Sequence, residues 1–174
     1  MTKWNIDQSH STVGFSVRHM VFAKVHGRFK TWTGSLDLDE ADFTKSKVDV
    51  TIDVNSIDTH DEKRDGHLKS ADFFDAGTYG SMTFKGKKIE KTGGEEYKLT
   101  GDLTIHGTTK EVTLDVDYGG RGKDPWGGER VGFHAKGSVN RVDFGLKWNQ
   151  ALETGGVLVG EKVEISIDLE AVKA

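Results

Sequence analysis

Apolar and polar residues alternate along most of this chain, which is the pattern of strands with one buried and one exposed face. The clearest run is near the C-terminus, where Val163, Ile165 and Ile167 alternate with Glu164 and Ser166. The alternation predicts eight to ten strands, with candidates over residues 4–7, 10–19, 25–31, 33–39, 48–54, 79–90, 99–105, 112–118, 131–139 and 163–169.

The alternation stops between residues 56 and 75, where charged residues gather. Thr59 or Asp61 can cap a short helix here, and Gly66 stands where that helix is expected to end. The segment closes on Phe73 and Phe74, so we interpret it either as a lid on a sheet structure or as an ordinary solvated connection.

Shorter breaks in the pattern predict the connections between strands. Residues 19–22 are expected to form a single helical turn, and the glycines at 93–94 predict a hairpin. The segment 119–129, which holds the only proline, and the segment 143–160 are expected to be loops.

These elements predict one all-β domain spanning residues 1–174. Short connections favour antiparallel pairing, and a long sheet with one apolar face must close on itself or pack on a second sheet. We therefore expect an antiparallel, lipocalin-like β-barrel of about eight strands, with a short helical insert near residues 59–70. A β-sandwich is the alternative.

Composition and charge narrow the function classes. A net charge of −4 without a dense basic cluster argues against nucleic acid as a partner. No run approaches the roughly 20 apolar residues of an integral membrane segment, and the absence of cysteine removes thiolate chemistry. The sequence as written predicts a cytoplasmic protein, or a periplasmic one if a signal peptide has been removed.

The seven histidines raise the question of metal binding. His60 and His67 lie too far apart on a helix to chelate one ion, and the common nucleophile and phosphate-loop motifs are absent, so we expect no metal and no catalytic residues. Arg64 beside Asp65, and Arg141 near Asp143, are interpreted as local ion pairs that hold the insert and a loop to the barrel rim.

Taken as a whole, the chain resembles the YceI-like family of polyisoprenoid-binding, lipocalin-like barrels. The resemblance runs from Trp4 to about Ala171 and rests on several short motifs in the expected order. They are Trp4-x-Ile6-Asp7-x-x-His10-Ser11, Phe15-Ser16-Val17-Arg18-His19-Met20, Val25-His26-Gly27-Arg28-Phe29, Ser56-Ile57-x-Thr59, Arg64-Asp65-Gly66-His67-Leu68, Asp72-Phe73-Phe74-Asp75, Gly101-Asp102-Leu103-Thr104-Ile105-His106-Gly107 and Arg141-x-Asp143-Phe144-Gly145.

The resemblance implies that an isoprenoid-tailed lipid, such as a polyprenyl phosphate, a polyprenol or a quinone, occupies the barrel interior. It implies a carrier, reservoir or sequestering protein without metal or redox cofactor, and a homodimer is a further expectation. We expect ligand contacts from Phe15, Val17, His19, Phe29, Arg64, His67, Phe73, Phe74, Met82, Phe84, Phe133, Arg141, Phe144 and Trp148.

Among these residues, Arg64, His67 and Arg141 are the candidates for selecting a head group at the mouth of the barrel. Two other functions stay open at this point. One is an enzyme that acts on a lipid-like substrate through His67, Asp65 or His19, and the other is a structural protein whose barrel is fully packed.

Overall fold

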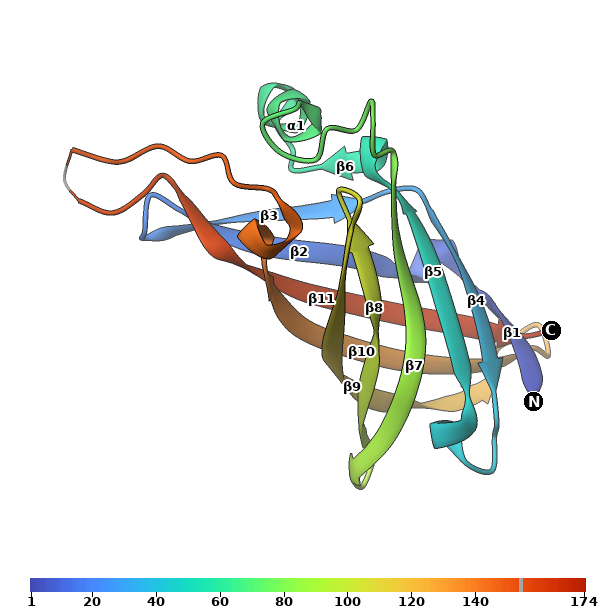
Figure 1. The fold of residues 1–174 in the computed structure, drawn as a ribbon. Helices are drawn as coiled ribbons and strands as arrows, with labels where there is room; N and C mark the ends of the chain where they lie inside the picture. Colours follow the sequence, from blue (N-terminus) through green and yellow to red (C-terminus); the bar gives the residue numbers. More distant parts are fainter. Residues whose placement is uncertain (154) are drawn as a thin grey trace.

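A computed structural model describes residues 1–153 and 155–174. Strands and one short α-helix account for most of them (Figure 1). In the described part of the chain the elements are β1 (Thr2–Ile6), β2 (Thr12–His19), β3 (Ala23–Phe29), β4 (Trp32–Leu38), β5 (Lys47–Asp53), β6 (Ile57–Asp58), α1 (Glu62–Lys69), β7 (Ser81–Gly93), β8 (Glu96–Ile105), β9 (Thr108–Lys123), β10 (Glu129–Asn140) and β11 (Val159–Lys173). Four 3-10 turns lie between them, η1 (Gln8–His10), η2 (Phe43–Lys45), η3 (Val54–Ser56) and η4 (Arg141–Phe144).

Eight of the described strands close into an antiparallel barrel. The order around it is β1-β4-β5-β7-β8-β9-β10-β11, and β11 pairs with β1 to complete the ring. Trp4 shows the closure, because it lies opposite Leu36 of β4 on one side and Lys173 of β11 on the other. The predicted lipocalin-like barrel of about eight strands is therefore confirmed, and the alternative sandwich is not formed.

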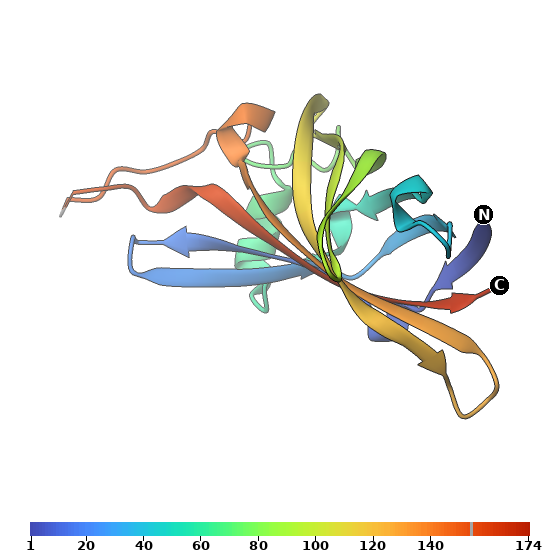
Figure 2. The same ribbon diagram turned by 90° about the horizontal axis from the view of Figure 1, so that it is seen from below.

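The strand β11 has two different neighbours along its length. Its end, from Ala171 to Lys173, pairs with β1, whereas the stretch from Val159 to Asp168 pairs with β2. The turn η1 separates β1 from β2 and lets the chain change direction between these two pairings. Figure 2 shows the result, a β2–β3 hairpin that runs away from the ring beside the first half of β11.

Alternation along the strands places apolar side chains inside the barrel and charged ones outside. In β11 the residues Val163, Ile165 and Ile167 face the interior, while Glu164 and Ser166 lie between them on the outer face. One end of the interior is filled around Trp4, which is only 2% exposed. Its core neighbours at this end are Leu36, Leu38, Val131 and Ala171.

The helical insert forms, with different ends from those expected. Of the two candidate caps, Asp61 is the one used, because its carboxylate accepts the backbone N–H groups of Lys63 and Arg64. The helix does not end at Gly66 but continues to Lys69. Two backbone hydrogen bonds, from Phe74 to Leu68 and from Ala76 to Lys69, then close the last turn.

Two predicted connections are wrong. Residues 19–22 do not form a helical turn, because Met20 and Val21 have positive φ and reverse the chain between β2 and β3. The loop expected at 119–129 shrinks to 124–128, since β9 continues to Lys123. A register shift beside Gly132 breaks the side-chain alternation there while backbone pairing continues, so the sequence pattern misses this part of β9.

None of the helices in the described residues is both long enough and apolar enough to traverse a lipid bilayer.

Gly66 provides a test of the helix. It is exposed inside α1, and a Cβ added there would meet no atom within 4 Å. Gly66→Ala is therefore expected to raise the free energy of unfolding by up to about 1 kcal/mol in urea denaturation, because alanine loses less backbone entropy in a helix. A fall in stability would mean that Gly66 ends the helix. As a contrast, Gly101→Ala is expected to destabilise, because its Cβ would lie 2.5 Å from the Lys85 carbonyl oxygen.

Candidate ligand-binding cavity

The barrel encloses a cavity of about 290 Å³. Side chains from β2, from the flanking β3 and from the ring strands β4, β5 and β7–β11 line it, and almost all of them are aliphatic or aromatic. Among the described lining residues only Lys47 and Arg141 carry a charge. A cavity with so few polar groups offers little to water and much to an apolar ligand.

Aromatic side chains close the end of the cavity next to η2. Phe43 lies 5.9 Å from Tyr97 and 5.7 Å from Phe133, measured between ring centroids. All three rings line the cavity. The turn η2 that carries Phe43 begins at Asp42, whose carboxylate accepts the N–H and hydroxyl of Thr44.

The opposite end is covered by α1 and the segment that follows it, which we call the lid (residues 59–76; Figure 1). Leu68, Phe73 and Phe74 of the lid line the cavity. Phe74 packs edge-on against Phe29, and Phe73 lies 5.4 Å from the ring of Trp148 in the loop after η4. The insert is therefore a lid rather than a solvated connection, because its apolar side chains complete the cavity wall.

Thr59 fixes the start of the lid. Its side chain is buried, donates to the Asp65 carboxylate at 2.6 Å and accepts from the Arg64 guanidinium at 2.8 Å. Asp65 also accepts the backbone N–H of Thr59, and Arg64 also donates to its carbonyl oxygen. Arg64 and Asp65 thus hold the insert through Thr59, rather than through the direct ion pair that the sequence suggested.

Arg141 is the one buried charge at the cavity wall in the described chain. Its guanidinium donates to the carbonyl oxygens of Leu146, Gly160, Trp148 and Val159 at 2.7 to 3.2 Å. No carboxylate pairs with it among the described residues, so the expected ion pair with Asp143 is not formed. Burial lowers the pKa of Arg141, and the Glu161 carboxylate acts in the opposite direction through space. The guanidinium stays protonated, and its positive charge faces the cavity without a direct ion pair among the described residues.

Comparison with known proteins shows to which family this chain belongs. The sequence model of the YceI-like domain family matches residues 4–171 of this chain. The chain belongs to the YceI-like family. It is 44% identical over 171 residues to a UPF0312 protein of Staphylococcus epidermidis, covering 98% of this chain and 97% of that protein. A UPF0312 protein of Vibrio parahaemolyticus is 41% identical over 138 residues, covering 79% of this chain and 73% of that protein.

Several solved structures share this barrel fold. BcnA of Burkholderia cenocepacia superposes with a TM-score of 0.84 at 28% identity, over 95% of this chain and 99% of that one. A YceI protein of Campylobacter jejuni gives a TM-score of 0.78 at 36% identity, over 100% and 99% of the two chains. A domain of Saccharophagus degradans, described as polyisoprenoid binding, gives 0.69 at 16% identity over the full length of both and shows the fold alone.

Ten of the fourteen residues expected to contact a ligand line the cavity of this YceI-like barrel. They are Phe15, Val17, Phe29, Phe73, Phe74, Met82, Phe84, Phe133, Arg141 and Phe144. Each of them except Arg141 is apolar, and those on strands could be assigned to the interior from alternation. Lining residues outside the expected set, such as Leu36, Leu103 and Leu114, follow the same alternation.

The other four expected residues do not line the cavity. His19 lies at the end of β2 opposite Val159, and Arg64 is engaged with Thr59. His67, within the lid, forms a 2.9 Å contact with Asp72 and packs edge-on against the ring of Trp148. These residues lie on the rim or behind it, where strand periodicity gives no guide to side-chain direction. The three proposed enzyme residues, His67, Asp65 and His19, are likewise not gathered at the cavity.

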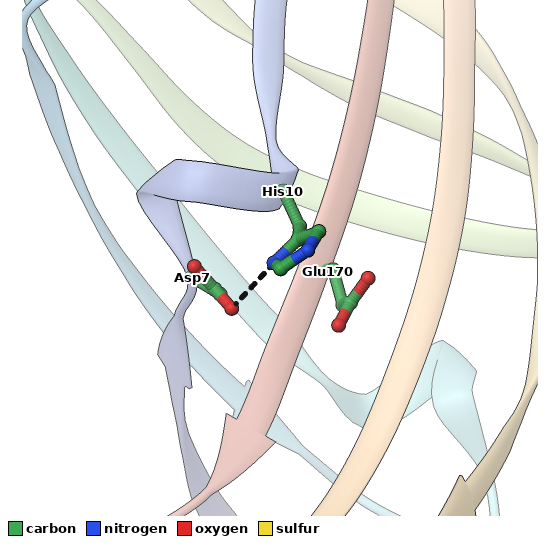
Figure 3. Close-up of side chains that lie close together, drawn as sticks. All are labelled: Asp7, His10 and Glu170. Carbon is green, nitrogen blue, oxygen red and sulfur yellow. Dashed lines mark hydrogen bonds and ion pairs between the residues drawn. The ribbon is translucent and has the colours of Figure 1, made fainter. Parts of the chain in front are cut away.

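One group of metal-type ligands comes together outside the barrel, at the junction of β1 and η1 (Figure 3). It consists of Asp7, His10 and Glu170, and Asp7 contacts the His10 ring at 3.0 Å. The Arg130 guanidinium already binds both carboxylates, Asp7 at 2.7 Å and Glu170 at 2.8 Å. A cation in the same place would be repelled by Arg130, so the geometry favours an ion-pair network that joins β1, β10 and β11.

Arg141 is expected to matter for stability as well as for charge. Arg141→Met should lower the free energy of unfolding by about 3 kcal/mol, because it removes a donor from four buried or partly buried carbonyl oxygens, of which that of Val159 keeps a hydrogen bond from the Asn149 amide. Arg141→Lys should lose less, since an ammonium group can still donate to up to three of them. Urea denaturation of both variants measures the difference, and equal stability of Arg141→Met and the parent would refute the structural role.

The ion pairs of Arg130 make the stability of the fold depend on pH. Hydrogen bonds from Ser9 and Arg130 hold the pKa of Asp7 well below its usual range, and Arg130 also lowers the pKa of Asp124. Carboxyl groups with lowered pKa stabilise the fold above their unfolded value of about 3.8 and lose that effect as pH falls further. Arg130→Gln should therefore lower the Tm at pH 7 and flatten its decline below pH 4. Parallel curves of Tm against pH would contradict this.

Proposed function

We propose that this protein binds an isoprenoid-tailed lipid, such as a polyprenol, a polyprenyl phosphate or a quinone, inside the barrel, and acts as its carrier, reservoir or sequestering protein. The observation that carries the proposal is the almost wholly apolar cavity, lined by aromatic rings next to η2 and by the lid at the other end. The Saccharophagus degradans domain of the same fold, described as polyisoprenoid binding, supports this ligand class.

The free energy of such binding comes from burial. Each isoprene unit transfers five carbons out of water, worth at most roughly 4 kcal/mol at about 0.8 kcal/mol per methylene. Several units would exceed the practical limit of non-covalent affinity, near −20 kcal/mol, so the ordering of the flexible tail must offset much of the gain. Shape and filling of the cavity, rather than polar contacts, then decide affinity.

A polar head group would lie near Arg141. Of the three residues first considered for this role, only Arg141 lines the cavity. Four of its N–H groups are already used by carbonyl oxygens, so its main contribution to a bound lipid is its positive charge, which no carboxylate of the described residues pairs with directly. This charge favours an anionic head group, such as a phosphate, over a neutral one.

The geometry favours binding over catalysis. Lys47, Tyr97 and Arg141 are the titratable side chains among the described lining residues. Of these, Arg141 is held by carbonyl oxygens, and Lys47 begins β5, at the edge of the barrel. No pair in this set offers the adjacent proton donor and acceptor that acid–base chemistry on a bound lipid requires.

Solvent extraction of the purified protein, followed by mass spectrometry, tests the proposal. The expected result is a prenyl lipid in near-stoichiometric amount, or saturable binding of an added prenyl alcohol by protein that has been stripped of lipid. An empty extract together with no binding of added prenyl alcohol would refute the proposal and favour a barrel with a structural role.

A cavity-filling variant sharpens this test. Ala135 lines the cavity from β10, and its neighbour Lys136 is exposed on the outer face. Ala135→Trp should abolish most lipid binding, because the indole occupies ligand space without adding a charge, whereas Lys136→Trp should leave binding unchanged. Circular dichroism of both variants establishes that they are folded. Equal lipid content in folded Ala135→Trp and Lys136→Trp would place the ligand outside the barrel.

A further inference from the structure

The turn between β2 and β3 presents a cluster of exposed apolar side chains. Val21 is 56% exposed and Phe22 is 82% exposed, although both are large and apolar. The loop before β11 meets this turn: the Met20 N–H donates to the Leu158 carbonyl oxygen at 2.8 Å, and Val157 beside it is 42% exposed. We call Met20, Val21, Phe22 and Val157 the apolar tip, which projects from the body of the barrel (Figures 1 and 2).

The backbone holds these side chains outward at a cost. Val21 has a φ of 72°, and the Phe22 N–H donates to the Met20 carbonyl oxygen at 2.9 Å, which makes a tight γ-turn centred on Val21. Positive φ is strained for a β-branched residue and would suit glycine or asparagine. A turn that only connected two strands would relieve this strain with such a residue, whereas here three apolar residues occupy it.

Charge on the hairpin indicates what the apolar tip contacts. From residue 12 to residue 36 the chain contains Arg18, Lys24, Arg28 and Lys30 and no acidic residue. Lys24 and Arg28 are partly neutralised by Glu164 and Asp58 of neighbouring strands. Exposed apolar side chains in front of basic ones are the pattern of segments that insert into the interface of an anionic bilayer. A second copy of the chain would bring the same basic hairpin against itself, which is unfavourable.

The apolar tip is continuous with the wall of the cavity. Val17 and Val159 both line the cavity, and each is only a few residues from the tip. Beside the tip, the Val159 carbonyl oxygen accepts from Arg141, whose guanidinium lies 5.8 Å from the centre of the Phe73 ring in the lid. A membrane contact at the tip would therefore bring the lid end of the cavity close to the lipid.

We propose that the apolar tip inserts into the interfacial layer of an anionic lipid bilayer and docks the lid end of the barrel on it. Insertion buries Val21 and Phe22, while Arg18 and Lys24, which pair with each other across the hairpin next to the tip, face the phosphate groups. This docking goes beyond ligand binding and has its own readout, so it can fail while the proposed function stands.

Sedimentation with phosphatidylcholine vesicles, with and without a fraction of phosphatidylglycerol, tests the docking. The parent protein should bind the anionic vesicles more tightly, and added salt should weaken this binding. The double variant Val21→Ser, Phe22→Ser should bind these vesicles about tenfold more weakly than the parent, or more weakly still, because it loses two apolar side chains that insertion would bury. Trp126→Ser is the matched control, since Trp126 is 83% exposed on the β9–β10 loop, away from the tip.

Val21→Gly provides a second variant that is expected to fold well. Glycine relieves the positive φ of 72°, so this variant should keep or raise the parent Tm while its vesicle binding falls. Lipid content measured in the same samples should be unchanged, which separates docking from ligand binding. Absence of vesicle binding by the parent, or equal binding by the parent and the double variant, would overturn the proposal. Loss of a dimer in the double variant, without vesicle binding by the parent, would assign the tip to a second copy.

Discussion

The short pairing between β1 and the end of β11 is the constraint on which the rest of the structure depends. Only Ala171 to Lys173 pair with β1, and this short contact closes the ring and removes its open edges. Over the rest of its length β11 pairs with β2 instead, so the ring is tight at one end and splayed at the other. The tight end is filled around Trp4, and the splayed end has to be covered by the lid.

This arrangement explains why polar groups gather at the splayed end. Loops that leave a barrel expose carbonyl and N–H groups, which must find partners when they are buried. Thr59 with Asp65 and Arg64 satisfies the start of the lid, and Arg141 satisfies four carbonyl oxygens of the η4 loop and the start of β11. Because carbonyl oxygens carry no net charge, the hydrogen bonds of Arg141 leave its positive charge at the edge of an apolar cavity. A lipid with an anionic head group would be favoured there.

Much of the fold could be predicted from the sequence, because alternation reports directly on which face of a strand is buried. Prediction from alternation failed where the backbone geometry departs from that of a regular strand. The register shift beside Gly132 hid the second half of β9, and the left-handed turn at Met20 and Val21 resembled a helical turn in sequence. Gly66 misled because glycine ends many helices, yet here it lies within one.

Prediction of which candidate residues line the cavity likewise succeeded for residues on strands and failed for residues at the rim. The interior position of residues such as Phe84 and Phe133 was predictable from their strands. His19, Arg64, His67 and Trp148 do not line the cavity, and rim side chains such as these follow no periodicity that would have shown it. The expectation that Arg64 and Arg141 form ion pairs failed for another reason: both arginines bind main-chain oxygens, which the sequence does not reveal. The free volume inside the barrel also depends on how side chains pack and could not be predicted at all.

A titration of the lipid-free protein with prenyl alcohols of increasing length tests the central claim, that burial of an apolar tail in the barrel drives binding. A barrel whose strands of roughly 10 residues tilt by about 40° is near 25 Å tall, and one isoprene unit extends roughly 5 Å. Affinity is predicted to rise with each added unit and to level off near about five units, where further carbons gain no burial. Affinity that does not depend on tail length from the shortest alcohol onward would contradict the account.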